Sequence, residues 1–389
     1  MRTSTFVYPW DVNGDPDAAR RIADLGVQQV TLAAAYHSTR ALTPRHPRHR
    51  IVTAQHAAVL YPADQQRWKG RELIPYEAGD WAPGDAYGEA AEALAGAGLD
   101  VHTWVVLAHN SRMGAEHPGT SVVNAYGDRY PWAPCIAQPA TRACLVDLAA
   151  EAATRPGARG TELESLGWYG LAHLHAHDKT GGVGLGEAGQ YLMSLCFCDT
   201  CREGYGRHGL DPVELAVSVR SALDPVWRGR ATDDGWATVE KLLGAETAAA
   251  TRAYRDSTAR TLQEAAVAAV RAAAPADRGT FQVLLHADPA SYHCGANAGV
   301  DPEHILSVAD GVVVPCTGGA GLVRPFAEQG RGVVAANLTV VRGMGGSPDT
   351  LAQDARAARD LGATELRLYH AGLASDGDLE AVAGALAEL

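Results

Sequence analysis

The stretch ATRACLVDLAAEAATRPGARGTELESL, residues 140–166, places a helix-like segment directly before a strand-like segment. In its first part apolar residues recur at three- and four-residue spacing, and a Pro-Gly pair follows, which is the pattern of an amphipathic helix and its end. Its last part, TELESL at 161–166, predicts a short strand. This helix–strand pair decides the fold because the same pair recurs along the chain.

Eight strand-like runs of β-branched or apolar residues alternate with Ala-rich helical segments. These runs are TFVYPW (5–10), VQQVTLA (27–33), VHTWVVL (101–107), TELESL (161–166), TFQVLLH (280–286), ADGVVVP (309–315), GVVAANL (332–338) and TELRLYH (364–370). Nearly continuous apolar strands joined by helical crossovers predict a parallel sheet that is covered on both faces. Eight such units, with no G-x-G-x-x-G turn after the first strand, favour a (β/α)8 TIM barrel over a doubly wound sheet.

A long insertion, residues 167–279, separates the fourth predicted strand from the fifth. It contains three closely spaced cysteines and two helical stretches, 212–223 and 234–274. No change of composition and no Ser/Gly-rich linker sets the insertion apart. We therefore expect residues 1–389 to form a single TIM-barrel domain of the α/β class, with this insertion after strand 4.

Composition limits the partners that this chain can have. The 389 residues carry a formal charge of −12, which argues against a nucleic-acid partner because phosphate backbones are bound by clustered positive charge. The opening residues MRTSTFVYPWDV lack the apolar core of a signal peptide, and no run approaches the ~18 apolar residues of a membrane span, so a cytoplasmic location without a membrane partner is predicted. A homo-oligomer is compatible with the sequence. The basic, proline-broken run STRALTPRHPRHRIV at 38–52 predicts a surface loop.

The loop after the fourth strand is the richest in polar residues, and in TIM barrels the chemistry lies on such loops at the C-terminal ends of the strands. Glu162 and Glu164 are two positions apart on one strand, so both point to the same face. Two carboxylates against the helix layer would be costly without partners, so we expect that face to be the barrel interior near its mouth. Glu164 is the candidate acid/base, with Glu162 beside it in the catalytic group.

The polar residues that follow predict a wall for a hydroxyl-rich ligand, with aromatic faces for a sugar ring. Substrate-binding candidates on this loop are Trp168, Tyr169, His173, His175, His177, Asp178 and Lys179. Those at the ends of other strands are Trp10, His37, His109, Asn110, His286 and Tyr369. Two alternatives for the histidines stay open: incidental residues of a solvated loop, or a zinc site made by His173, His175 and Asp178, which are suitable ligand types.

Three of the seven cysteines fall within six positions, in the stretch Cys196-Phe197-Cys198-Asp199-Thr200-Cys201. In a cytoplasmic protein such clustering indicates metal ligands or redox groups before it indicates disulfides. A thioredoxin-type site would need C-x-x-C within a thioredoxin-like βαβ pattern, which is absent here.

The segment YPWAPCIAQPATRACLVDLAAEAATR (130–155), the strand ending in Glu164 and the segment LCFCDTCREGYGRHGL (195–210) together resemble the retaining β-galactosidases of glycoside hydrolase family forty-two. The resemblance covers roughly residues 130 to 210. It implies a (β/α)8 barrel, an acid/base Glu at the end of the fourth strand and a structural zinc. By position, it implies the zinc ligands Cys135, Cys196, Cys198 and Cys201. Four thiolates would close the coordination sphere, so such a zinc would support folding and not catalysis.

Glycoside cleavage generally needs a second carboxyl group besides the acid/base. In the family the nucleophilic Glu closes the seventh strand, but the matching run GVVAANLTVVRGMGG (332–346) has no carboxylate. Asp288, which follows the fifth strand, is the candidate partner of Glu164, and an Asx-turn before Pro289 is its alternative role. The predicted function is a glycosidase-like enzyme for a small carbohydrate. A metal- or Lys/His-assisted sugar isomerase or lyase, and a barrel that binds carbohydrate without catalysis, remain alternatives.

Overall fold

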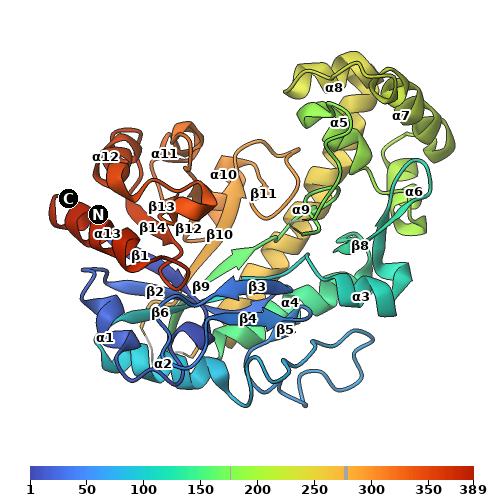
Figure 1. The fold of residues 1–389 in the computed structure, drawn as a ribbon. Helices are drawn as coiled ribbons and strands as arrows, with labels where there is room; N and C mark the ends of the chain where they lie inside the picture. Colours follow the sequence, from blue (N-terminus) through green and yellow to red (C-terminus); the bar gives the residue numbers. More distant parts are fainter. Residues whose placement is uncertain (176, 276–278) are drawn as a thin grey trace.

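The computed structural model describes residues 1–175, 177–275 and 279–389 and contains a closed barrel of eight parallel strands (Figure 1). The barrel strands are β1 (Arg2–Val7), β2 (Gln29–Tyr36), β6 (Asp100–Val106), β9 (Ala158–Glu164), β10 (Gln282–Asp288), β12 (Gly311–Pro315), β13 (Val333–Thr339) and β14 (Glu365–Tyr369). They neighbour one another in chain order, and pairing of β1 with both β2 and β14 closes the ring. The predicted (β/α)8 fold is confirmed.

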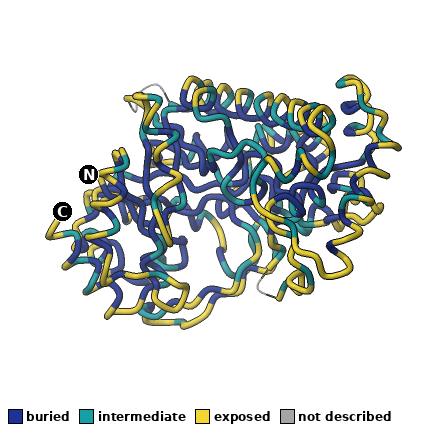
Figure 2. Tube along the Cα trace, turned by 90° about the horizontal axis from the view of Figure 1, so that it is seen from above, coloured by how far each residue is buried: buried dark blue, intermediate teal, exposed yellow. Residues whose placement is uncertain are grey.

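The barrel strands form because their residues are buried on both faces. All eight residues of β2 are buried, and β6, β12 and β14 are buried along nearly their whole length. Figure 2 shows this core as the buried trace surrounded by partly exposed and exposed segments. A strand that is buried on both faces needs no alternation of polar and apolar residues. For that reason, the apolar runs in the sequence indicated where these strands lie.

Helices cover the outside of the barrel and are rich in alanine, which lets them pack closely on the strands. They are α1 (Ala18–Ala23), α2 (Ala86–Gly96), α4 (Pro139–Ala153), α10 (Pro302–Val308), α11 (Arg324–Ala327), α12 (Leu351–Asp360) and α13 (Asp376–Ala387). In the described part of the chain no helix is long and apolar enough to cross a membrane.

The insertion after β9 builds a helical layer to one side of the barrel, at the upper right of Figure 1. Its helices are α5 (Gly186–Met193), α6 (Asp199–Arg207), α7 (Pro212–Trp227), α8 (Trp236–Leu243) and α9 (Ala245–Ala273). The predicted helical stretch 234–274 is two helices, because Gly244 adopts φ +82° between α8 and α9, a conformation that interrupts a helix. The long helix α9 returns the chain to the barrel by packing against α4.

Short strands form within the loops at the barrel mouth. They are β3 (Thr39–Leu42), β4 (Ile51–Ala54), β5 (Ala58–Val59), β7 (Ser121–Val123), β8 (Arg129–Pro134) and β11 (Ala298–Gly299), and the short helix α3 (Ser111–Glu116) lies among them. The run 38–52, predicted as a surface loop, forms most of the antiparallel β3–β4 hairpin. Its alternating burial explains the pairing: Ala41, Val52 and Ala54 face inward while their neighbours are exposed.

Candidate functional site

Glu162 lies inside the barrel in a buried ion pair. Its Oε1 is 2.7 Å from Nε of Arg367 on β14, and neither side chain has solvent exposure. The rings of His102 and His286 come within 3.6 and 3.7 Å of the same carboxylate. Burial alone raises the pKa of Glu162, but the charge of Arg367 and the hydrogen bonds from His102 and His286 together outweigh it and hold the pKa well below its usual range. Glu162 is therefore a fixed anion whose geometry suits a structural role better than proton transfer.

Glu164, the last residue of β9, lies in a different environment. Its side chain keeps 12% of its surface exposed, and Oε2 accepts a hydrogen bond from the Trp104 indole Nε1–H at 2.7 Å. Nδ1 of His286 lies 4.0 Å from the same oxygen. Among the described residues no arginine or lysine forms an ion pair with Glu164. The carboxylate is thus held in position by a neutral donor and remains accessible from the mouth.

An aromatic wall surrounds Glu164 on the β1, β2 and β14 side. Trp104 packs at 4.6 Å from the ring of Tyr36, and the Tyr8 hydroxyl donates to the Tyr36 hydroxyl at 3.0 Å. Tyr369 lies 6.0 Å from Trp104, edge to face. Burial raises the pKa values of all three tyrosines, so their hydroxyls stay neutral at physiological pH. Trp10 stacks on Tyr8 at 4.6 Å and extends the wall outward.

A row of imidazoles continues from the aromatic wall, where the ring of His37 stacks on Tyr36 at 4.2 Å. His109 lies 4.8 Å from the ring of His37, 4.3 Å from Tyr169 and 5.6 Å from His173. Burial lowers the pKa of His109 to about 2, with help from the two neighbouring histidines, so its ring is neutral. The Tyr169 hydroxyl lies 3.3 Å from His173 Nε2. Four predicted binding residues from three different strand ends therefore come together beside Glu164.

Other predicted binding residues lie away from this mouth. Asn110 caps α3, its Oδ1 accepting from the backbone N–H of Met113 at 3.0 Å. Trp168 is buried against α9 and donates to the backbone oxygen of Arg255 at 3.0 Å. Asp178 accepts from the backbone N–H of Leu174 at 2.7 Å and so fixes its own loop. The remaining members of this loop, His175, His177 and Lys179, are exposed.

Asp288 stands at the end of β10, the strand next to β9. Its Oδ1 accepts from the backbone N–H of Ala290 at 2.8 Å, which is the Asx-turn that was the alternative role, and its Oδ2 lies 3.8 Å from Nδ1 of His293. Burial raises the pKa of Asp288, while the charge of His293 opposes that rise. His286, two residues earlier, fills the barrel interior between the two glutamates.

Sequence reasoning did not select several residues that build the site, namely Phe6, Tyr8 and Arg367. Phe6 and Tyr8 alternate along the first strand-like run, which is the signal for one shared face. Arg367 is the only charged residue between Glu365 and the end of its apolar strand, and such a residue needs a buried counter-ion. His370 is fully buried, and burial lowers its pKa to about 3.

The four cysteines Cys135, Cys196, Cys198 and Cys201 form a candidate metal centre beside the barrel. The four sulfur atoms all lie within 4.8 Å of one another, which is close enough for one metal ion to bind them all. Sγ of Cys135 lies 3.7 Å from that of Cys198 and 3.5 Å from that of Cys201. A tetrahedral zinc with ~2.3 Å Zn–S bonds would separate its sulfurs by about 3.8 Å, so the geometry fits.

Backbone groups around the cysteines also fit thiolate ligands. The backbone N–H groups of Val123 and Cys198 point at Sγ of Cys196 from 3.4 and 3.5 Å. Cys198 caps the N-terminus of α6, where the helix dipole favours negative charge. The cluster joins the end of β8 to the start of α6, so a bound ion would tie the insertion to the barrel. By contrast, His173, His175 and Asp178 do not converge within the same 4.8 Å limit.

No family model matches the sequence, and no curated protein matches it. Solved structures do match in fold. An α-L-fucosidase isoenzyme 2 from Paenibacillus thiaminolyticus has 13% identity and a TM-score of 0.61 over 100% of this chain and 49% of that chain. The glycoside hydrolase domain of PgaB (BpsB) from Bordetella bronchiseptica has 15% identity and a TM-score of 0.56, with 98% of each chain covered.

A GH42 β-galactosidase from G. stearothermophilus has 11% identity and a TM-score of 0.54 over 98% of this chain and 55% of that chain. All three neighbours are glycoside hydrolases by name, and the GH42 protein does not stand out among them. This chain spans about half the length of the fucosidase and of the β-galactosidase. At these identities the similarity establishes the (β/α)8 fold that the three proteins share with this chain.

Proposed function

We propose that this chain is a glycoside hydrolase that acts on a small glycoside or oligosaccharide, with Glu164 as the acid/base. The observation that carries the proposal is the contrast within one strand. Glu162 is neutralised by Arg367, whereas Glu164 is partly exposed and accepts from the neutral Trp104 indole, with His286 4.0 Å away. A carboxyl group without an arginine or lysine partner can carry a proton to a leaving oxygen.

Asp288 is the proposed second carboxylate. It ends the neighbouring strand, so its backbone and that of Glu164 meet the mouth on adjacent loops. In glycosidases the second carboxylate either attacks the sugar directly or activates a water molecule, and both roles need it ionised. The nearby His293 favours that ionised form.

The cysteine centre is proposed to hold one structural zinc. Cys135, Cys196, Cys198 and Cys201 would be its ligands, and a closed four-thiolate sphere supplies folding free energy and no catalytic position. A cytoplasmic location, a carbohydrate as the small-molecule partner and the single-domain organisation stay predictions that accompany this proposal, as do a homo-oligomer and the lack of a nucleic-acid partner.

A second candidate, a metal- or imidazole-assisted sugar isomerase or lyase, is favoured by the row of His37, His109 and His173 beside Glu164. Neutral imidazoles can shuttle protons or bind a divalent ion when a substrate brings further ligands. Such chemistry would depend on the histidines and would not need Asp288.

The test is turnover of a panel of p-nitrophenyl glycosides by the wild-type chain and by Glu164→Gln, Asp288→Asn and His109→Phe variants. Loss of a general acid/base lowers kcat by about 10²–10⁴-fold, and we expect that loss for Glu164→Gln. Glu92→Gln, at an exposed site on α2, is the matched control and should keep full activity. Aldose–ketose interconversion that survives Asp288→Asn but not His109→Phe would replace the proposal by the second candidate. Sugar binding without any turnover would leave a carbohydrate-binding barrel.

A further inference from the structure

A groove of about 830 Å³ opens beside the mouth, between the turn of the β3–β4 hairpin and the segment that leads into α2. Its volume falls in the range of about 300–1,000 Å³ that is usual for small-molecule sites. Its walls come from the segments that follow β1 and β2, namely the loop after β1, the β3–β4 hairpin and the first turn of α2 with the residues before it. We call it the side groove and define it by Trp10, His46, Arg48, His49, Asp80 and Trp81.

Two tryptophans in the side groove have indole N–H groups without hydrogen-bond partners among the described residues. Trp10 keeps only 4% of its surface exposed, and its Nε1 is buried; Nε1 of Trp81 is buried as well. Trp81 lies over Gly79, where a Cβ atom would come within 2.6 Å of the ring. A buried donor without an acceptor is costly, and most such groups in folded proteins are satisfied. Both N–H groups are closed off from the groove as it stands, so a ligand hydroxyl could accept from either one only after the indole turns toward it.

The charges of the side groove favour a neutral ligand. His46 has both ring nitrogens engaged: Nδ1 accepts from the backbone N–H groups of Arg48 and His49, and Nε2 lies 3.0 Å from the backbone oxygen of Asn13. His49 stacks on His46 at 3.6 Å, and burial together with the nearby His46, Arg48 and Arg50 lowers the pKa of His49. Arg48 is the remaining cation, and its Nε is tied to the backbone oxygen of Gly14 at 3.2 Å.

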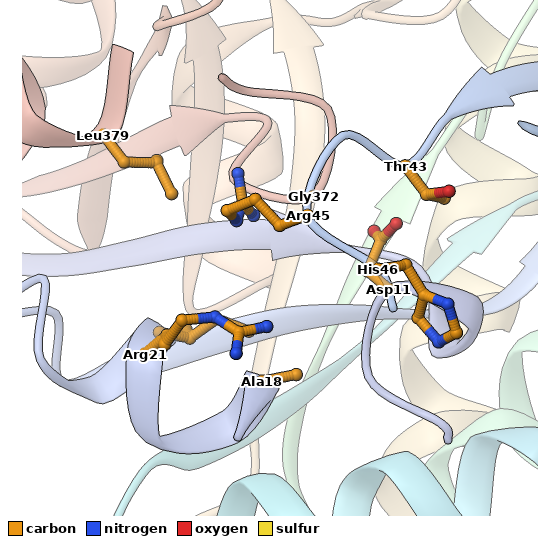
Figure 3. Close-up of a pocket in the computed structure, with 9 residues that line it drawn as sticks. Asp11, Ala18, Arg21, Thr43, Arg45, His46, Gly372 and Leu379 are labelled. Carbon is orange, nitrogen blue, oxygen red and sulfur yellow. The ribbon is translucent and has the colours of Figure 1, made fainter. Parts of the chain in front are cut away.

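Two carboxylates, Asp80 and Glu89, line the same groove and offset the single arginine. An anionic ligand would therefore meet no net positive field, whereas the hydroxyls of a neutral sugar can both donate to carboxylates and accept from indoles. The small cavity shown in Figure 3 lies on the other side of His46 and holds only about 20 Å³, enough for one water molecule and no sugar.

The side groove continues the aromatic wall of the candidate active site. Trp10 stacks on Tyr8 at 4.6 Å, Tyr8 stacks on Trp104 at 5.8 Å, and Trp104 donates to Glu164. These rings are buried, so they connect the groove with Glu164 through packing and leave the sugar units to the groove itself. A monosaccharide derivative at Glu164 would leave the groove empty.

We propose that the side groove binds neutral sugar units of an oligosaccharide, remote from the bond that is cleaved, with the partly exposed Trp81 as its stacking platform. This inference rests on the proposed glycosidase function and specifies its substrate class. It makes the preferred substrate a chain of several neutral sugars and makes Trp81 a specificity residue that does not touch the reacting atoms.

The experiment compares long and short substrates on the Trp81→Ala variant. An aromatic contact is worth about 0.5–1.5 kcal/mol, so we expect KM for the hexasaccharide that is cleaved best to rise about 2- to 10-fold. Kinetics on the p-nitrophenyl monoglycoside should not change. The hexasaccharide panel consists of cello-, xylo-, manno-, malto- and β-1,4-galactohexaose. Trp227→Ala removes an exposed tryptophan on α7 and is the matched control. Trp81→Phe keeps the ring over Gly79 and should lie between wild type and Trp81→Ala.

Binding to the Glu164→Gln variant separates this inference from the proposed function. Intrinsic fluorescence titration with the same five hexasaccharides should show binding that weakens when Trp81→Ala is added, even if no substrate is ever cleaved; that result would support the groove while the glycosidase proposal fails. A different result is cleavage that depends on Glu164 while Trp81→Ala changes KM equally for long and short substrates, or changes it for neither. That result would contradict the inference about the side groove and would still support the glycosidase proposal. Absence of binding by all five hexasaccharides would also contradict the inference about the side groove.

Discussion

Glu162 and Arg367 form an ion pair with 2.7 Å between Oε1 and Nε in the middle of the barrel, where neither side chain touches solvent. Arg367 also reaches Glu365 at 2.9 Å. This pair gives the two glutamates of β9 different surroundings: the inner one is held to β14 across the barrel, and the outer one is partly exposed and accepts from Trp104. The proposed role of Glu164 thus depends on an arginine that takes up the charge of Glu162.

The first prediction concerns the stability of this pair. Arg367→Met should lower the free energy of unfolding by about 3–5 kcal/mol, because it leaves the Glu162 anion buried without its cation. Arg356→Met breaks an exposed ion pair with Glu388 and should cost no more than about 1 kcal/mol. Urea denaturation followed by circular dichroism measures both. Equal losses for the two variants would show that the buried pair has no special role.

A second prediction addresses the metal centre. We expect one zinc per purified chain by mass spectrometry of metals, and loss of that zinc in Cys198→Ala, with a lower unfolding midpoint because metal binding and folding are coupled. Cys144→Ala is the control, since Cys144 is buried on α4 outside the cluster and should keep the metal. Retention of zinc by Cys198→Ala together with its loss from a His173 variant would move the site to the histidine loop.

The third prediction uses the pKa of Asp288. Burial raises this pKa, so if Asp288 must be ionised for catalysis, kcat/KM falls as the pH drops through a value above the ordinary aspartate range. His293→Gln removes a charge that favours the ionised form and should shift this acidic limb to higher pH without abolishing activity. An acidic limb that stays in place in His293→Gln would assign it to another group.

The fold could be predicted because its signal is local. Each barrel strand is buried on both faces and so appears as an apolar run, and eight runs with helical segments between them leave few alternatives. The hairpin within residues 38–52 was missed because its alternation is short and broken by two prolines. The break between α8 and α9 depends on the conformation of Gly244, which a helical pattern alone does not reveal.

The candidate site was only partly predictable because its partners are distant in sequence. The spacing of Glu162 and Glu164 correctly indicated a shared face, but their different surroundings come from Arg367, 205 positions away from Glu162. Trp168 follows the same strand and yet turns to α9, a direction set by the insertion. The cysteine cluster was easier, since three of its members lie within six positions and only Cys135 had to be added by resemblance.

The last prediction concerns Asp11, which lies beside Arg45 and Gly372 in the small cavity of Figure 3. Burial raises the pKa of Asp11 from 3.8 to about 7, against a backbone hydrogen bond from Tyr8 and the charge of Arg45. Between these two values the folded chain holds a proton that the unfolded chain has lost, so this group's contribution to stability is full below about pH 4 and falls as the pH rises to about 7. The loss is at most about 4 kcal/mol.

Asp11→Asn keeps an acceptor for the Tyr8 N–H but cannot titrate, so its free energy of unfolding should decrease less than that of the wild type between about pH 4.5 and about pH 7.5. Asp360→Asn, at an exposed site on α12, should follow the wild type. Parallel pH curves for wild type and Asp11→Asn would mean that Asp11 is already ionised in the folded chain, with Arg45 as its counter-ion.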